Sequence, residues 1–247
     1  MQHRLVAATS RPVPPSGAVA ALAAAAWLVI IVFAVGGGGA VVRHDRLITG
    51  GLPLWQATLV FVAGWQVMLA AMMLPPSLPA IRRRRDETGG AARFVAGYLL
   101  VWNAFGLAAF FFDVGVHATV DHSPWLAMHP WLIAGTTLVV AGSYQLSGVK
   151  SAFVTAARSV NSAPAGLMTG GLAYGLRCLG ANWALMLLAF AIGAGSIALM
   201  AALTAGMIWE ATPWGRDTVK PLGYALIAVG VLVLAGPTQG VALWSSR

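Results

Sequence analysis

Residues 166–209 read GLMTGGLAYGLRCLGANWALMLLAFAIGAGSIALMAALTAGMIW, an almost unbroken apolar run with a single charged residue, Arg177. A helix needs about 20 mainly apolar residues to cross the hydrocarbon core of a bilayer. The run is therefore too long for one membrane span and long enough for two. We expect the turn between them at residues 193–196, Gly-Ala-Gly-Ser, because glycine and serine favour breaks between elements.

The rest of the chain repeats this pattern. Counting the two spans of the long run, seven membrane helices are predicted, at about 17–41, 54–74, 94–117, 130–149, 166–192, 197–209 and 221–243. Apolar residues make up 59% of the 247 residues and charged residues only 9%, whereas a soluble domain has about 25% charged residues. This composition excludes a soluble globular protein and a disordered one. It predicts an all-α, polytopic transmembrane bundle in one domain, 17–247, after a flexible cytoplasmic tail, 1–16.

The basic residues predict an orientation for this bundle. The chain carries 15 Lys and Arg against 7 Asp and Glu, and cytoplasmic loops of membrane proteins are enriched in Lys and Arg. With the N-terminus inside and seven spans, 12 basic residues fall inside and 3 outside, and the block from Arg82 to Arg85 dominates the difference. We therefore predict N-in and C-out insertion in the cell inner (plasma) membrane, with the lipid bilayer as partner. No nucleic-acid-binding motif accompanies the basic residues, so nucleic acid is excluded as a partner.

Sulfur-containing side chains are the candidate ligands within the spans. Met68 and Met72 are four residues apart and share one face of the second helix, and Met73 follows directly. Thioethers and thiolates are soft ligands that suit Cu(I), and Cys178 is the only cysteine of the chain. The alternative is that these residues only fill a helical core.

Other polar residues have structural alternatives as well. Asp113, His117 and Asp121 recur every four residues and could hold a divalent metal if the third helix extends that far; otherwise they belong to a solvated loop. Glu210 is expected to be an interfacial charge near the basic residues that follow it. The small-xxx-small pair Gly171 and Gly175 favours helix contact within one chain over a dimer face.

Three stretches together resemble a known family. They are Trp65-x-x-Met68-x-x-Ala71-Met72-Met73-x-Pro75, Tyr144-Gln145-x-x-x-x-Lys150 and Gly171-x-x-x-Gly175-x-x-Cys178-x-x-x-x-Trp183-x-Leu185-Met186. The pattern is similar to that of prokaryotic predicted metal-binding integral membrane proteins, sometimes labelled copper chaperones, from about residue 55 to 235. Glu210 falls where that family tends to have an acidic residue. The family has further cysteines where this chain has Phe153, Ala157, Ala181 and Asn182.

The resemblance implies a non-enzymatic membrane protein that handles a metal, most plausibly copper. The implied Cu(I) site consists of five side chains on the second and fifth spans: Met68, Met72, Met73, Cys178 and Met186. One alternative is an accessory or structural subunit that binds a partner membrane protein and no metal. Another is a small-solute transporter with Arg177 and Asn182 in its pathway. Walker and HExxH motifs are absent from the sequence, which excludes an ATPase and a zinc protease of that type.

Overall fold

The computed structural model describes residues 15–36, 44–82, 90–158, 167–192, 197–212, 215 and 219–236. Within these residues the protein is all-helical, so the predicted all-α class is confirmed. The helices are α1 Pro15–Val35, α2 His44–Thr49, α3 Leu54–Met72, α4 Leu74–Arg82, α5 Gly90–His122, α6 Pro124–Ala127, α7 Pro130–Gln145, α8 Gly148–Arg158, α9 Leu167–Ile192, α10 Ile197–Ala211 and α11 Val219–Ala235. The tail 1–14, Arg83 to Arg85, the turn at 193–196 and the C-terminus lie outside the described residues.

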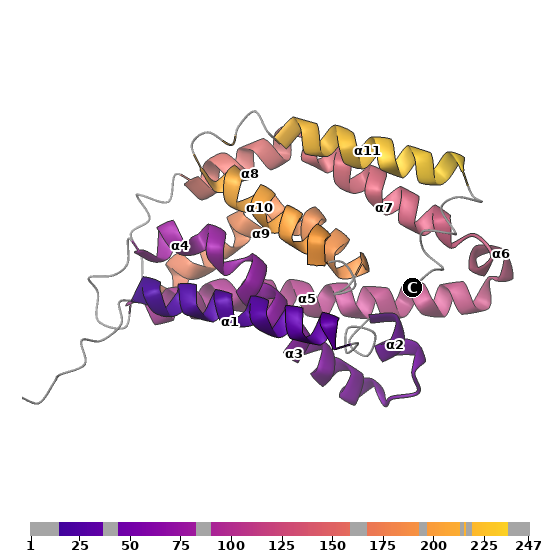
Figure 1. The fold of residues 1–247 in the computed structure, drawn as a ribbon, viewed down its shortest axis with the longest axis horizontal. Coiled ribbons are helices and arrows are strands. Elements are labelled where there is room, and N and C mark those ends of the chain that lie inside the picture. The colour runs from indigo at the N-terminus through magenta and orange to yellow at the C-terminus, as the bar shows by residue number, and fades with distance from the viewer. Residues whose placement is uncertain are drawn as a thin grey trace, which may run out of the picture.

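The long helices form a bundle with a helical hairpin beside it (Figure 1). α1, α3 and α5 run along one side, and α9 packs on α5 along much of its length. α11 packs against α7 to make the hairpin on the opposite side. α4, α8 and the C-terminal end of α10 gather at one end of the bundle, which is where the candidate site lies.

Fewer helices than the predicted seven are long enough to cross a membrane. Four meet the requirement of length and apolarity: Gly17–Val35, Leu54–Met72, Gly90–His122 and Met168–Ala191. A fifth span results if α7 and α8, which are bent by 58° at their junction, are taken as one broken span. α10 and α11 are apolar but have only 15 and 17 residues, which is short for a bilayer core about 30 Å thick.

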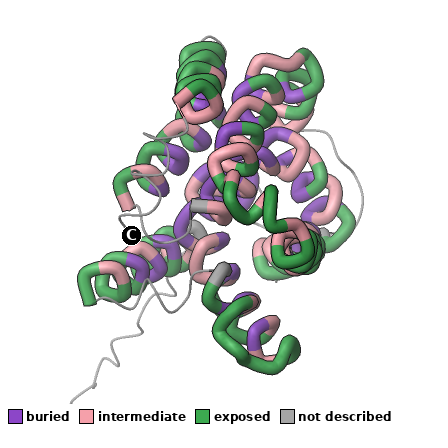
Figure 2. The backbone as a smooth tube through the Cα atoms, turned by 90° about the vertical axis from the view of Figure 1, so that its right-hand side faces the viewer, coloured by how far each residue is buried: buried purple, intermediate pink, exposed green. Residues whose placement is uncertain are grey.

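The outer surface of the bundle is apolar, as membrane association requires. Leu28, Val35, Phe112 and Leu232 are each at least 63% exposed. Figure 2 shows long exposed stretches on the outward faces of the helices, with burial confined to the faces that meet. Monomeric soluble proteins rarely expose apolar patches of this extent. These faces are suited to contact with lipid acyl chains.

The sequence predicted that the second helix ends at Pro75 and Pro76. In the structure a further helix, α4, begins there instead. α3 ends at Met72, and α4 starts at Leu74 with Pro75 and Pro76 in its first turn, where a missing N–H is tolerated. Pro75 cannot donate to the Ala71 carbonyl, and the Trp27 indole donates to that oxygen instead, at 3.0 Å. Such replacement donors allow proline breaks inside a membrane bundle.

Glycines let α5 and α9 approach closely. A Cβ atom on Gly97 would lie 2.4 Å from the Met168 carbonyl oxygen, and one on Gly171 would lie 2.1 Å from that of Phe94. Gly175 also faces α5, at Val101. The small residues of the fifth predicted span therefore serve a contact inside one chain, as expected.

We expect Gly97→Ala to lower the free energy of unfolding by about 1–3 kcal/mol, because backbone atoms of α9 must move aside. Gly115→Ala on the same helix is the matched control, since nothing lies within 4 Å of its added Cβ. Detergent-solubilised variants can be compared by thermal and SDS-induced unfolding. Equal stability of the two variants would show that the α5–α9 contact is looser than described.

Candidate functional site

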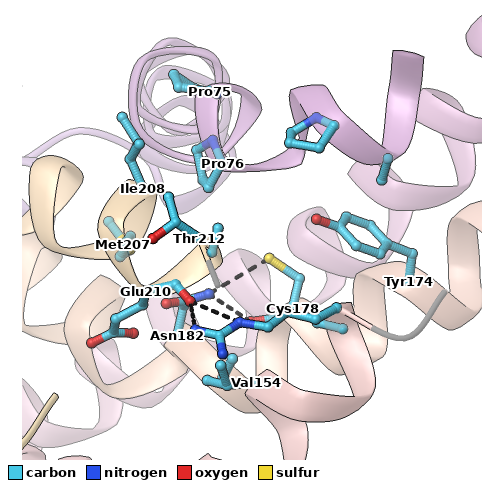
Figure 3. A pocket seen from close by; sticks show the side chains of 16 residues that line it. Pro75, Pro76, Val154, Tyr174, Cys178, Asn182, Met207, Ile208, Glu210 and Thr212 are labelled. Carbon is cyan, nitrogen blue, oxygen red and sulfur yellow. Dashed lines mark hydrogen bonds between the residues drawn. The ribbon is translucent and has the colours of Figure 1, made fainter. Parts of the chain in front are cut away.

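A cavity of about 610 Å³ opens at the end of the bundle where α4, α8, α9 and α10 meet. Side chains one helical turn apart line it on each helix, because residues i, i+3 and i+4 share a face. On α9 these are Tyr174, Cys178, Ala181 and Asn182; on α10 they are Met207, Ile208, Glu210 and Ala211. Figure 3 shows Cys178, Asn182 and Met207 around this space, with the prolines of α4 opposite.

The Cys178 thiol is buried and held by two polar side chains. The Tyr98 hydroxyl of α5 lies 3.4 Å from Cys178 Sγ and donates to the Met73 carbonyl at 3.0 Å. Asn182 Nδ2 donates to the Cys178 carbonyl at 3.1 Å and lies 3.6 Å from Sγ. Tyr98 thus connects the end of α3 to the cysteine of α9. These contacts fix the direction of the thiol at the cavity wall.

One polar atom of the cavity wall, the side-chain oxygen of Asn182, lacks a hydrogen bond within the described part of the chain. Asn182 is only 8% exposed, and its Oδ1 has no hydrogen-bond partner among the described residues. A buried carbonyl oxygen without a donor costs about 1–3 kcal/mol. The side chain therefore has one acceptor available for a donor that enters the cavity.

Next to the cavity, three polar side chains form a buried charged cluster. Lys150 Nζ lies 2.9 Å from Glu210 Oε2 and donates to Gln145 Oε1 at 2.5 Å. Gln145 Nε2 donates to Glu210 Oε1 at 2.6 Å. Glu210 is therefore a buried partner of Lys150, and the expectation of an interfacial charge was wrong.

The bend between α7 and α8 makes this cluster possible. Ser147 Oγ accepts from the Lys150 backbone N–H at 3.2 Å, as a capping residue does at a helix start. The bend places Gln145 at the end of α7 and Lys150 in the first turn of α8 against Glu210 of α10. Arg158 at the other end of α8 donates to the Glu210 carbonyl. Glu210 thus joins three helices beside the cavity.

Comparison with known protein families matches residues 62–233 to the family described as PpoB2, copper chaperone. The matched segment covers well over half of the chain and includes all three stretches that carried the resemblance. The chain belongs to the PpoB2 copper chaperone family. No curated protein and no solved structure matches it.

Membership of the PpoB2 family makes the sulfur-containing side chains candidate copper ligands. The structure places the five predicted ones in three different surroundings. Cys178 lines the cavity. Met72, Met73 and Met186 are fully buried in the core, and Met73 contributes its carbonyl oxygen to the Tyr98 contact. Met68 lines a second, apolar cavity of about 360 Å³ between α1, α3, α9 and α10.

Sequence reasoning missed one sulfur-containing side chain of the cavity, Met207. Its side chain is 2% exposed and lines the same cavity as Cys178. It lies three residues before Glu210, and this spacing places both on one face of α10. This spacing could have identified Met207 from the sequence, because Glu210 was already a candidate residue.

The positions at which the resemblance implies further cysteines also lie close together. Ala157, Ala181 and Asn182 line the cavity with Cys178. The Phe153 ring lies against α9, within 2.5 Å of where a Cβ on Gly180 would be. The resemblance therefore pointed to one region of the fold.

The polar residues of α5 do not assemble a metal site in the described part of the chain. α5 continues to His122, so Asp113, His117 and Asp121 do share a helix. His117 Nδ1 lies 3.0 Å from the Asp113 carbonyl oxygen and 3.6 Å from its carboxylate. No three His, Cys, Asp or Glu side chains that the structure describes come close enough together to hold a metal ion.

Proposed function

We propose that this protein holds Cu(I) as cargo in the cavity beside Cys178 and passes it on without chemical change, as a non-enzymatic membrane protein. The observation that carries the proposal is that Cys178 and Met207, a thiol and a thioether, line the same cavity. Both are soft ligands, and Cu(I) is the ion that prefers them. Membership of the copper chaperone family supports the same cargo.

This proposal narrows the predicted ligand set. Cys178 and Met207 are the proposed ligands, whereas Met72, Met73 and Met186 are fully buried in the core and do not line the cavity. Met68 lines the apolar cavity instead, so it serves as a comparison in the binding experiments. Met200 is the other sulfur-containing residue at that second cavity.

The cavity end of the bundle is proposed to face the cytoplasm. Arg82 ends α4 and Arg158 ends α8, and Lys and Arg are enriched on the cytoplasmic side. Seven spans, with α10 and α11 as short ones, an N-terminus inside and a C-terminus outside remain part of the proposal. Copper would then enter and leave the cavity from the cytoplasm.

Site-directed labelling tests this topology. Single cysteines at positions 88 and 120 in a Cys178→Ser background are exposed to a membrane-impermeant maleimide on intact cells. We expect labelling at position 120 only, and at position 88 after permeabilisation. Labelling at position 88 on intact cells would contradict the proposed orientation.

Titration of the purified chain with Cu(I), in competition with a chromophoric chelator such as bicinchoninate, tests the function. One Cu(I) per chain is expected for the wild type. The accessory-subunit and transporter alternatives predict no Cu(I) retained at chelator concentrations that leave a thiolate site filled. A partner membrane protein co-purifying with a copper-free chain would favour the accessory role.

A further inference from the structure

A buried hydrogen-bond donor without an acceptor lies beside Cys178. Trp102 has no exposed surface, and its indole nitrogen Nε1 makes no hydrogen bond among the described residues. Trp102 follows Tyr98 by about one helical turn, so both lie on the face of α5 that meets α9. The indole N–H lies close to the Cys178 thiol and the Tyr98 hydroxyl, without the geometry of a complete hydrogen bond to either. Buried N–H groups without an acceptor are rare in folded proteins, so this donor is available for an acceptor that forms when a ligand binds.

The neutral form of the Cys178 thiol explains why the indole lacks an acceptor. The Tyr98 hydroxyl has one proton, which it donates to the Met73 carbonyl at 3.0 Å. In its contact of 3.4 Å with Cys178 Sγ, the thiol is therefore the donor and the hydroxyl oxygen is the acceptor. A neutral thiol is itself only a weak acceptor, and Asn182 Nδ2 already lies 3.6 Å from the same sulfur. The sulfur in this form leaves the indole N–H unsatisfied.

A sulfur that binds a metal has different requirements. The thiolate is the metal ligand, not the thiol, so copper takes the place of the thiol proton at Cys178. The S–H bond breaks, the Cu–S bond forms, the proton leaves to water, and copper stays in the +1 state. The sulfur then carries negative charge and no longer donates to Tyr98. Hydrogen bonds to a charged acceptor are stronger than those between neutral groups, and the indole N–H already lies close to this sulfur.

We propose that the Trp102 indole donates to the Cys178 thiolate once Cu(I) is bound, and that Trp102 is thus a positioning residue of the copper site. The proposal rests on the proposed copper function. An indole suits this position because it stabilises charge on the sulfur without bringing a positive charge that would repel Cu(I). Replacing a residue that contacts a metal ligand in this way typically lowers metal affinity by about 10–100-fold.

Trp102→Phe removes the N–H and keeps an aromatic ring. We expect the affinity for Cu(I), measured by chelator competition on the full chain in detergent, to fall by about tenfold. Trp27→Phe is the matched control, because the Trp27 indole donates to the Ala71 carbonyl at 3.0 Å. Its loss should lower the thermal stability and leave the affinity for Cu(I) unchanged. Equal affinities of Trp102→Phe and the wild type would overturn the proposal.

A spectroscopic measurement separates a positioning role from a purely structural one. The isotope-labelled indole N–H groups of the ten tryptophans are followed by NMR while Cu(I) is added to the wild-type chain. We expect one resonance, the one that is missing in Trp102→Phe, to move downfield as its N–H gains a charged acceptor. If that variant does not fold, the contact of the indole proton with the Tyr98 ring identifies the resonance.

The outcomes separate the two proposals. Copper bound by the wild type with the Trp102 resonance unmoved would leave the copper function in place and overturn the role of Trp102. The same downfield shift in Cys178→Ser would also overturn that role, because serine supplies no thiolate. No copper on the wild-type chain would overturn both proposals.

Discussion

Lys150→Met should lower the free energy of unfolding by about 3–5 kcal/mol, one of the largest effects of any single substitution in this chain. Lys150 has no exposed surface, and Glu210 is only 4% exposed. Removing the ammonium leaves a buried carboxylate that keeps a side-chain hydrogen bond from the Gln145 amide. The cost of breaking a buried ion pair from one side arises mainly from this uncompensated charge.

A second substitution separates charge from packing. Lys150→Met combined with Glu210→Gln removes both charges and leaves an amide that can bond to Gln145, so most of the stability should return. Lys220→Met is the control for loss of a lysine in general, because Lys220 is exposed at the start of α11. SDS-induced unfolding measures all three. A double variant as unstable as Lys150→Met alone would show that the pair stabilises the fold through packing and not through its charges.

Cys178→Ser should weaken Cu(I) binding by at least about a hundredfold, because the loss of a thiolate ligand exceeds the 10–100-fold typical of losing a neighbour of a ligand. Met207→Leu should weaken it by about tenfold, since a thioether is a soft ligand but carries no charge and binds more weakly than a thiolate. Both replacements nearly conserve volume at buried positions, and a Met-to-Leu exchange usually costs less than about 1.5 kcal/mol of stability. Affinity is measured by chelator competition.

Met68→Leu is the matched control for Met207→Leu. Both remove a thioether from a cavity wall, but Met68 lines the apolar cavity without Cys178. Its affinity for Cu(I) should equal that of the wild type. A large loss in Met68→Leu with none in Met207→Leu would instead support the ligand set first predicted from the sequence.

Hydropathy predicted the long helices well, because a helix that crosses the lipid core needs about 20 mainly apolar residues. Each of the seven apolar runs contains a helix, and the turn expected at 193–196 falls between the end of α9 and the start of α10. The break at Met73 followed by a second helix, α4, was not predicted. Prolines usually end a helix, and here a donor from a distant residue, the Trp27 indole, satisfies the Ala71 carbonyl that Pro75 leaves free.

The site was predicted only in part, since its members come together through tertiary packing. Cys178 was identified because it is the single cysteine of the chain and belongs to a recognisable pattern. Tyr98 and Met207 are ordinary aromatic and apolar residues in the sequence. The contact of Tyr98 with Cys178 and the position of Met207 at the cavity depend on how α5, α9 and α10 pack together, which no local pattern encodes. Lys150 and Glu210 were each recognised, but their pairing depends on the 58° bend after α7.

X-ray absorption at the copper edge, on the Cu(I)-loaded full chain, is the most direct measurement of the proposed cargo site. We expect sulfur neighbours at a little over 2 Å, by analogy with the roughly 2.3 Å of zinc thiolates. One sulfur should be lost in Met207→Leu, and in Cys178→Ser a nitrogen or oxygen neighbour should take the place of the thiolate sulfur. Copper with only nitrogen or oxygen neighbours in the wild type, or a sulfur shell unchanged by both substitutions, would contradict a copper site at Cys178.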